Sequence, residues 1–349
     1  MTKEKNITVG CDIGGAHLKV ARAQDGRIVE ALTLATPIWL GLDRLTTAIR
    51  EALPLFSGSS LNAFTMTGEL SDIFPSREAG IATLLQMISE HFPGEAHIYA
   101  GRSGFVSPDR AVALAMDVAS ANWHASAALV AKLTGDALFV DMGSTTTDII
   151  VTQGGVVAND GYTDAERLLA GELVYTGFTR SALIGVASSA PVRGRMTPLM
   201  NEYFASIADA HRILGVLDEA DDKQSAADGQ AKTVDGSIAR IARMVGRDTS
   251  DLTAPEWREL AGWFSEQQLR TVHDAAFRVA GKLAAKPDAP LVGAGIGRRQ
   301  LKRLADRLQR RFIDFADLIP ATEESRSEAS SAAPAAALAI LACDLPRKG

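Results

Sequence analysis

The chain has 349 residues, 46% of them hydrophobic and 22% charged, so it can bury one large core or two ordinary ones. Its net charge of −6 and pI near 5.6 exclude the broad basic surface that binds nucleic acid. Two cysteines, Cys11 and Cys343, are too few for a disulfide framework or a cysteine metal cluster. No run of about 18 apolar residues is present to span a membrane, and the charged N-terminus lacks the apolar core of a signal peptide. We therefore expect a soluble, cytoplasmic protein without nucleic-acid or membrane partners; these properties specify no oligomeric state.

A strand–turn–strand pattern opens the chain. Apolar residues 7–12 end in Asp12, and Gly14 and Gly15 make a turn before the strand resumes over residues 17–23. Asp25-Gly26 is a short hairpin signal, and a third strand follows over residues 28–34. The pattern predicts three antiparallel strands joined by tight turns.

The same pattern returns 129 residues later without a gap. Residues 137–141 end in Asp141, Gly143 and Ser144 make the turn, and residues 146–152 resume the strand before Gly154-Gly155. Asp141 thus aligns with Asp12, and Gly143 aligns with Gly14. A repeat at so long a period indicates two duplicated lobes rather than a solenoid.

The remaining segments divide into helices, short strands and loops by their apolar periodicity. Helices are predicted over residues 42–53, 81–91, 198–217, 237–245, 255–270, 271–285, 298–312 and 332–341, with a further helical stretch within 164–178. Strands are predicted at 97–100 and 290–294, an exposed loop at 218–233 and a loose linker at 325–331. These elements suggest an N-terminal lobe (1–134), a C-terminal lobe (135–324) with a helical insertion at about 164–289, and a linker with a final helix (325–349).

The two turns have the composition of a phosphate site. Turns of this kind expose a concave row of backbone N–H groups, and glycine allows phosphate oxygens to approach closely. The predicted phosphate-binding residues are Gly14, Gly15, Ala16, His17, Lys19, Gly143, Ser144, Thr145, Thr146 and Thr147. Asp12 and Asp141, at the strand ends, are the predicted holders of a hydrated Mg²⁺, an ion that prefers a few carboxylates and several waters.

A third glycine-rich element, VGAGIG, contains Gly293, Gly295 and Gly297 between a strand and a helix. Placed third, after two phosphate turns, it resembles the ligand motif of the actin-like (ribonuclease H-like) superfamily, which includes acetate and sugar kinases and heat-shock ATPases. The resemblance implies an α/β fold of two duplicated lobes around a ligand cleft, with these three glycines beside the ligand.

Longer motifs narrow the resemblance. The opening segment DIGGAHLK (12–19) is similar to that of hydantoinase A/oxoprolinase-like proteins. Further motifs resemble one branch of these proteins, which is associated with tetrahydromethanopterin-linked one-carbon metabolism and methanofuran biosynthesis. The motifs are TMTGELSDIFPSR (65–77), FVSP (105–108), ASANW (119–123), VDMGSTTTDII (140–150), RLLAGELVYTGFTR (167–180), NEYFASIADAHRILG (201–215) and DGQAKTVDGSIARIARMVGRD (228–248).

This branch implies a transferase that joins (5-aminomethylfuran-3-yl)methyl diphosphate to the phenol of γ-glutamyltyramine, or a polyglutamyl form, and releases diphosphate. The product belongs to methanofuran or its bacterial relative methylofuran. The resemblance implies Mg²⁺ as cofactor and small molecules as partners, with ATP possible but not favoured. Two alternatives stay open. The first is an ATP-dependent kinase or oxoprolinase-type hydrolase, although the larger oxoprolinase chains carry domains that 349 residues cannot hold. The second is a non-catalytic nucleotide-binding regulator.

A phenol with a pKa near 10 benefits from a carboxylate base. The candidate catalytic residues are Asp148, Glu172 and Glu69, with Asp12 as a further possibility. Among the arginines that can bind diphosphate or a glutamyl carboxylate, Arg180 is preferred; the others are Arg102, Arg193 and Arg195. Trp123, Tyr175, Tyr203 and Phe204 can stack on a furan or phenol, with core packing as the alternative. Cys11 is interpreted as a buried strand residue.

Overall fold

The structure, a computed structural model, describes residues 6–346 and contains two large sheets whose strands follow the same order. The first sheet, ordered β3-β2-β1-β4-β5-β6, is formed by β1 (Ile7–Ile13), β2 (His17–Gln24), β3 (Arg27–Ala35), β4 (Leu61–Met66), β5 (Ala96–Tyr99) and β6 (Phe105–Val106). The second, ordered β10-β8-β7-β13-β14 with β9 also on β8, is formed by β7 (Ala137–Met142), β8 (Thr147–Gln153), β9 (Val156–Val157), β10 (Leu173–Val174), β13 (Leu291–Ala294) and β14 (Phe312–Asp314).

The strand directions repeat as well as the order. β1 is antiparallel to β2 and parallel to β4, and in the second sheet β7 is antiparallel to β8 and parallel to β13. The outer pairs, β4 with β5 and β13 with β14, are both parallel. The two sheets are therefore copies of one unit, and the predicted duplication is confirmed.

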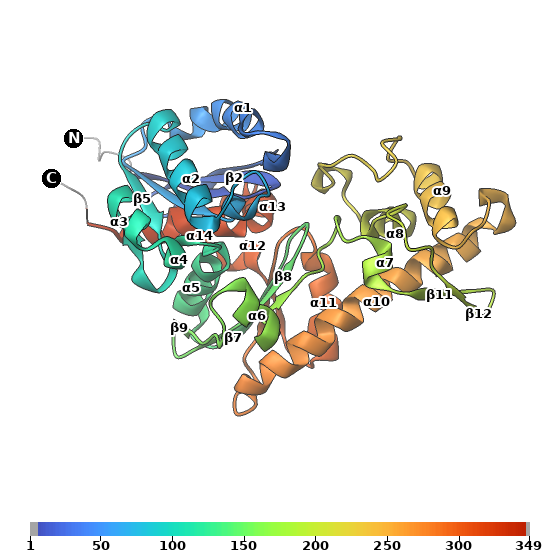
Figure 1. The fold of residues 1–349 in the computed structure, drawn as a ribbon. Helices are drawn as coiled ribbons and strands as arrows, with labels where there is room; N and C mark the ends of the chain where they lie inside the picture. The colour runs from blue at the N-terminus through green and yellow to red at the C-terminus, as the bar shows by residue number, and fades with distance from the viewer. Residues whose placement is uncertain (1–5, 347–349) are drawn as a thin grey trace.

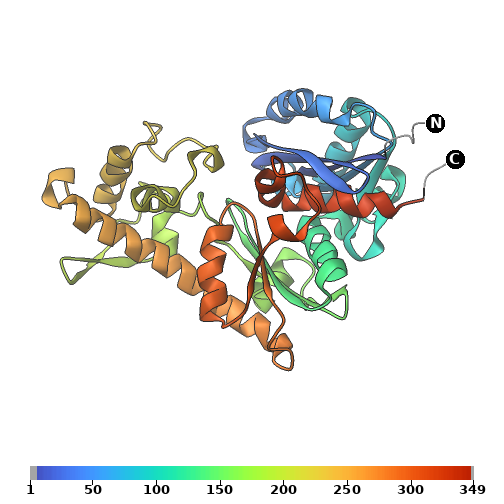
Figure 2. The same cartoon turned by 180° about the vertical axis from the view of Figure 1, so that it is seen from behind.

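Two helices, α5 (Asn122–Thr134) and α14 (Ala333–Leu341), lie between the sheets (Figures 1 and 2). α14 packs on β1, β2 and β4, α5 packs on β7, β8 and β9, and the two helices pack on each other. The chain end thus returns to the first sheet. Close contact requires a small residue at Gly10, where a Cβ atom would lie 2.0 Å from the Ala335 carbonyl oxygen.

Further helices cover the outer faces. α1 (Leu42–Ala52) and α2 (Arg77–His91) share an apolar core with the first sheet, while α11 (Arg298–Arg307) and the C-terminal half of α10 (Ala254–Ala280) share one with the second. The remaining helices are short: α3 (Pro108–Ala113), α4 (Ala115–Val118), α6 (Asp164–Ala170), α12 (Phe315–Leu318) and α13 (Arg326–Ser331).

The first half of α10 carries a separate helical insertion (Figure 1). It contains α7 (Leu183–Val186), α8 (Ile207–Leu214), α9 (Val234–Met244) and the hairpin of β11 (Ser189–Val192) and β12 (Arg195–Pro198). Buried Arg212 and Arg240 form ion pairs with Asp222 at 2.6 Å and Asp228 at 3.1 Å, respectively. These pairs fix the 218–233 segment, which the sequence predicts as a loop.

Several predicted boundaries differ from the structure. The predicted helix 198–217 is reduced to α8, because Ser206 and Asp209 form a capping box that begins the helix at Ile207. The predicted helices 255–270 and 271–285 are one helix, α10, which ends at Ala280, since neither glycine nor proline lies at the junction of residues 270 and 271. The predicted linker 325–331 is instead mostly helix α13, whose Ala329 and Ser330 are buried. The helix predicted to Phe312 ends at Arg307, and β14 follows.

Within residues 6–346, no helix is long and apolar enough to cross a lipid bilayer.

The Gly10 contact gives a stability prediction. Gly10→Ala should lower the free energy of unfolding by about 2–3 kcal/mol, because the new methyl group must push α14 away from β1. Urea denaturation followed by circular dichroism measures the change. Gly262→Ala is the matched control: Gly262 lies in α10 with open space around it, so this change should be neutral or stabilising by up to about 1 kcal/mol. An unchanged midpoint for Gly10→Ala would contradict the packing argument.

Candidate active site

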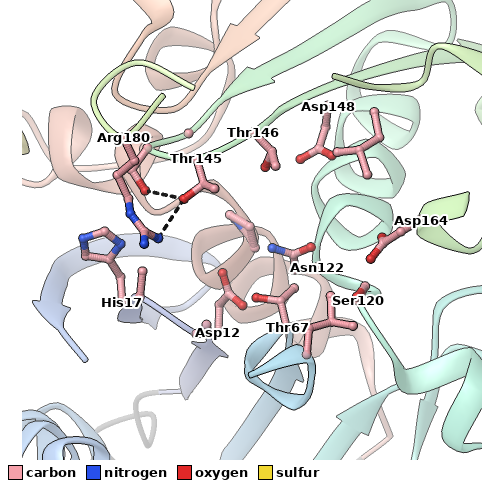
Figure 3. Close-up of a pocket in the computed structure, with 18 of the residues that line it drawn as sticks. Asp12, His17, Thr67, Ser120, Asn122, Thr145, Thr146, Asp148, Asp164 and Arg180 are labelled. Carbon is pink, nitrogen blue, oxygen red and sulfur yellow. Dashed lines mark hydrogen bonds between the residues drawn. The ribbon is translucent and has the colours of Figure 1, made fainter. Parts of the chain in front are cut away.

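The two glycine turns are equivalent and border one cavity of about 430 Å³. The N–H group of Gly14 donates to the carbonyl of His17 at 2.9 Å, and that of Gly143 donates to Thr146 at 3.0 Å. Both turns line the cavity, so the expectation that they face one cleft is confirmed. Figure 3 shows side chains of both hairpins converging on this space.

Most of the predicted phosphate and metal residues line the cavity. They are Asp12, Gly14, Gly15, Ala16, His17, Lys19, Asp141, Gly143, Ser144, Thr145, Thr146 and Arg180. Of the three preferred candidate bases, Asp148 alone lines the cavity. Of the four candidate aromatic residues, Tyr175 alone lines it.

Strand pairing makes the two halves of the cavity electrostatically different. Asp12 lies directly opposite Lys19 on β2, whereas Asp141 lies directly opposite Asp148 on β8. The first hairpin therefore pairs a carboxylate with a cation, and the second pairs two carboxylates. The equivalent backbone positions 19 and 148 carry opposite charges.

Burial raises the pKa of Asp12 and raises that of Asp141 to about 7. Lys19 lowers the pKa of Asp141, while the negative charges of Asp148 and Asp12 raise it further. One oxygen of Asp12, Oδ1, is buried without a hydrogen-bond partner. A cation would stabilise the ionised forms of these two buried carboxylates, because burial is the main cause of their raised pKa values.

This donor set fits Mg²⁺ rather than a metal that needs an all-protein cage. Among the residues that the structure describes, no three His, Cys, Asp or Glu side chains gather closely enough to hold a metal ion. Mg²⁺ commonly binds through one or two carboxylates and completes its shell with water and phosphate oxygens. Asp12 and Asp141 supply that number of ligands beside two phosphate-type turns.

His17 is uncharged at neutral pH. Burial lowers its pKa to about 3, and the positive charges of Lys19, Arg180 and Lys223 lower it as well. Its imidazole can donate one hydrogen bond to a phosphate oxygen but adds no positive charge. The cations beside the turns are therefore Lys19 on β2, Arg180 after β10 and Lys223 in the 218–233 segment.

Arg180 links the two sides of the cleft. Its Nη1 donates to Thr145 Oγ1 at 3.1 Å, and its guanidinium carbon lies 5.0 Å from the centroid of the Trp39 ring. Trp39 follows β3 in the first lobe, and Thr145 is in the glycine turn of the second. The same side chain thus contacts a phosphate-type turn and an aromatic ring. Figure 3 shows its hydrogen bond to Thr145.

Asp148 is held by a buried arginine. Arg167 Nη2 donates to Asp148 Oδ1 at 2.5 Å and to the Glu172 carbonyl at 3.2 Å. The guanidinium carbon lies 4.2 Å from the centroid of the Trp123 ring. Trp123, a stacking candidate from the sequence, is therefore a buried support for Arg167 and does not line the cavity.

The other two candidate bases lie outside the cavity. Glu172 is fully buried, and its carboxylate accepts from the backbone N–H groups of Asp160 and Gly161 and from Lys282 Nζ at 2.8 Å. Glu69 accepts from the N–H and hydroxyl groups of Ser120 at 2.9 and 3.0 Å. Both oxygens of Glu172 accept hydrogen bonds, whereas Glu69 Oε2 is buried without a hydrogen-bond partner; neither side chain lines the cavity.

The third glycine element packs against β7 and does not border the main cavity. Gly295 has φ +82°, and a Cβ atom there would lie 2.4 Å from Asp141 Oδ1. Gly293 contacts the Phe312 ring, and Gly297 contacts the Met142 side chain. These three glycines do not line the main cavity, although Ile296 between them lines an adjoining pocket with His17 and Gly143; that they lie beside the ligand stays a prediction. Thr147 is likewise turned away, since its hydroxyl donates to the Thr176 carbonyl at 2.7 Å.

The remaining candidates do not line the cavity. Arg102 stacks on the Tyr162 ring, and Arg193 pairs with Glu256 at 2.7 Å. Arg195, Tyr203 and Phe204 belong to the helical insertion, and Cys11 is a buried free cysteine in β1.

Sequence reasoning missed several lining residues: Trp39, Thr67, Leu70, Ser71, Asp72, Ser120, Asn122, Asp164, Arg167, Leu173 and Pro334. Most lie within segments 65–77, 119–123 and 167–180, which carry the family resemblance but in which no role is predicted for these positions. Asp164 lies just before the last of these segments. Trp39 and Pro334 are outside all of them.

The repeated sheets, the paired turns and the cleft between them define a protein of the actin-like fold. Among solved structures, the nucleotide-free structure of acetone carboxylase, from a study of ATP-dependent acetone carboxylation, superposes with a TM-score of 0.59 at 11% identity. The match covers 96% of this chain and 70% of that chain.

The family model described as Hydantoinase/oxoprolinase matches residues 60–336, and the chain belongs to this family. It is 28% identical over 303 residues to (4-{4-[2-(gamma-L-glutamylamino)ethyl]phenoxymethyl}furan-2-yl)methanamine synthase from Methanocaldococcus jannaschii, covering 86% of this chain and 89% of that protein. A synthase of the same name from Methanococcus vannielii is 29% identical over 204 residues, covering 58% of this chain and 89% of that protein.

The carboxylate pair gives a metal-binding prediction. In the presence of inorganic diphosphate, Asp12→Asn and Asp141→Asn should each weaken binding of Mn²⁺, used as a spin probe for Mg²⁺, by at least roughly tenfold, because each removes a charged ligand. The electron paramagnetic resonance signal of free Mn²⁺ measures the affinity. Asp109→Asn, an exposed carboxylate remote from the cavity, is the control and should have no effect. Unchanged affinity in both cavity variants would exclude this pair as the metal site.

Proposed function

We propose that the chain is a transferase that forms the aryl ether of methanofuran or methylofuran. It would join (5-aminomethylfuran-3-yl)methyl diphosphate to the phenol of γ-glutamyltyramine, or of a polyglutamyl form. The observation that carries this proposal is the similarity to the archaeal furan-methanamine synthase over 86% of the chain. The family match over residues 60–336 includes the second glycine turn and most of the other segments that line the cleft, and the cleft has the groups that a diphosphate ester requires.

The proposed reaction exchanges one C–O bond for another. The phenol oxygen attacks the exocyclic CH₂ of the furan, and the bond from that carbon to the diphosphate oxygen breaks. The electron pair of that bond leaves with the diphosphate, and the phenol proton passes to a base. Because the electron-rich furan can share positive charge on this carbon, stabilising the departing diphosphate should supply most of the catalysis.

The cleft offers matching groups for the leaving diphosphate. The turns at Gly14 and Gly143 present backbone N–H groups, and Lys19 and Arg180 add positive charge from opposite sides. Asp12 and Asp141 would hold Mg²⁺, whose chemistry here is neutralisation of diphosphate charge. These residues would bind and orient the leaving group without ATP.

Asp148 is the base that this geometry favours. It lines the cavity seven residues after Asp141, and its ion pair with Arg167 fixes the position of its carboxylate. A carboxylate held in this way can accept the phenol proton as the new ether bond forms.

The proposal predicts ether formation without ATP. The purified protein, supplied with Mg²⁺, the furan diphosphate and γ-glutamyltyramine, should yield the ether and diphosphate in equal amounts, because the substrate already carries its leaving group. Mass spectrometry detects the ether, and excess EDTA should abolish it. If the ether appears only with ATP and ADP accumulates in step, the kinase-like alternative is correct. ATP hydrolysis or ring opening of an amide without any ether would refute the transferase.

The role of Asp148 gives a separate prediction. Asp148→Asn should lower kcat by about 10²–10⁴-fold, since the amide cannot accept the phenol proton. A ring-fluorinated γ-glutamyltyramine, whose phenol is more acidic, should lose less activity in the variant than the parent substrate does. Glu69→Gln, a carboxylate change just outside the cavity, is the control and should keep kcat within about threefold. Equal losses with both phenols would indicate that Asp148 is only structural.

A further inference from the structure

The entrance of the cleft differs chemically from its interior. Three large apolar side chains that line the cavity are exposed: Trp39 at 39%, Leu70 at 43% and Tyr175 at 71%. Most other lining residues are polar, and several are buried or nearly so, as at Ser120, Asp148 and Arg167; Leu173 and Pro334 are buried apolar exceptions, and Asp72 is an exposed carboxylate. Apolar surface that stays in contact with water beside a ligand site is unfavourable unless a ligand covers it.

The three exposed side chains come from both lobes. Ile38 and Thr36 donate from their N–H groups to the carbonyls of Gly15 and Ala16, which sets Trp39 beside the first glycine turn. Leu70 belongs to the same side, because Ile38 packs on Gly68. Tyr175 follows β10, whose Val174 pairs with Thr147 just after the second turn. The apolar groups therefore flank the two turns from opposite sides of the cleft.

Arg180 completes this entrance. It stacks over Trp39 and is hydrogen-bonded to Thr145, and it forms no ion pair with any carboxylate in the described part of the chain. A guanidinium held over an aromatic ring, at the edge of a phosphate-type turn, offers both a flat surface and an unpaired positive charge.

We infer that this entrance, formed by Trp39, Leu70, Tyr175 and Arg180, is the binding subsite for the aromatic ring of the acceptor. The inference rests on the proposed transferase function and assigns its two substrates to different parts of the cleft. The furan diphosphate has its anion on the turns, and its positively charged aminomethyl group suits the polar interior at Asp164 and Asp148. The phenol ring then covers the exposed apolar side chains, and its glutamyl tail extends into solvent.

This arrangement explains why the entrance is apolar while the interior is not. A phenol stacked at Trp39 and Tyr175 has its hydroxyl directed inward, toward the diphosphate-bearing carbon, and its flexible tail directed outward. Because the entrance opens to solvent, a tail of one or several glutamates would contact no part of the protein. The subsite therefore selects a para-substituted phenol and is tolerant of tail length. The chemical class of the acceptor is therefore a tyramine-type phenol with an anionic tail.

Steady-state kinetics of the full chain tests the subsite. Trp39→Ala should raise KM for γ-glutamyltyramine by roughly tenfold and KM for the furan diphosphate by less than about threefold, because the acceptor loses its stacking surface while Arg180 keeps its hydrogen bond to Thr145. Trp39→Phe should recover most of the loss. Leu40→Ala removes the neighbouring side chain, which is exposed but does not line the cavity, and should change neither constant.

A binding measurement separates this inference from the proposed function. Saturation-transfer NMR with γ-glutamyltyramine alone should detect the phenol ring on the wild type and on Leu40→Ala but not on Trp39→Ala. If no ether forms under any condition while this binding pattern holds, the transferase fails and the aromatic subsite stands. If Trp39→Ala raises KM for the diphosphate instead, or if ring binding survives in this variant, the subsite assignment is overturned.

Discussion

The structure depends on two buried carboxylates at the ends of equivalent strands, facing one cavity. Asp12 and Asp141 occupy the same place in duplicated hairpins, and burial together with mutual repulsion raises the pKa of Asp141 to about 7. Such a pair persists only where nearby cations compensate it, and the fold provides Lys19 opposite Asp12. Asp148, opposite Asp141, adds negative charge and in turn requires Arg167, which is itself supported by the Trp123 ring. Several residues of the cleft wall thus balance the buried negative charges: Lys19 lies opposite Asp12, and Arg167 pairs with Asp148.

Duplication conserved the backbone but not the charges. The two sheets share strand order, strand direction and the hydrogen bond that closes each glycine turn. The side chains at the matching positions 19 and 148 are lysine and aspartate, so one hairpin contributes a cation and the other a second acid. A symmetric cleft would bind a symmetric ligand. This asymmetry instead suits a substrate that has an anionic leaving group and a separate proton to transfer.

The predictable features were those encoded over short stretches or by the repeat itself. Alternation and glycine turns predicted both hairpins, and the fixed offset predicted that Gly14 and Gly143 face each other. The position of Glu172 was not predictable, because its environment is set by Lys282, 110 residues away in the sequence. Gly295 looked like a ligand contact because its local pattern matches one, yet its close neighbour is Asp141 on an adjacent strand. Trp39 was missed for a similar reason: no motif surrounds it, and only the chain path past Gly15 brings it to the cleft.

Arg180 connects the two halves of the proposed chemistry. Its hydrogen bond to Thr145 places the guanidinium at a turn suited to the leaving diphosphate, while its stacking on Trp39 places it at the entrance suited to the acceptor ring. A diphosphate bound first would engage the guanidinium and fix its plane, and with it the ring surface of Trp39. The acceptor would then meet an ordered entrance rather than a mobile one, which reduces the entropy lost on binding. On the proposed function, bound diphosphate therefore strengthens acceptor binding without being required for it, since the acceptor subsite includes a residue that the diphosphate positions.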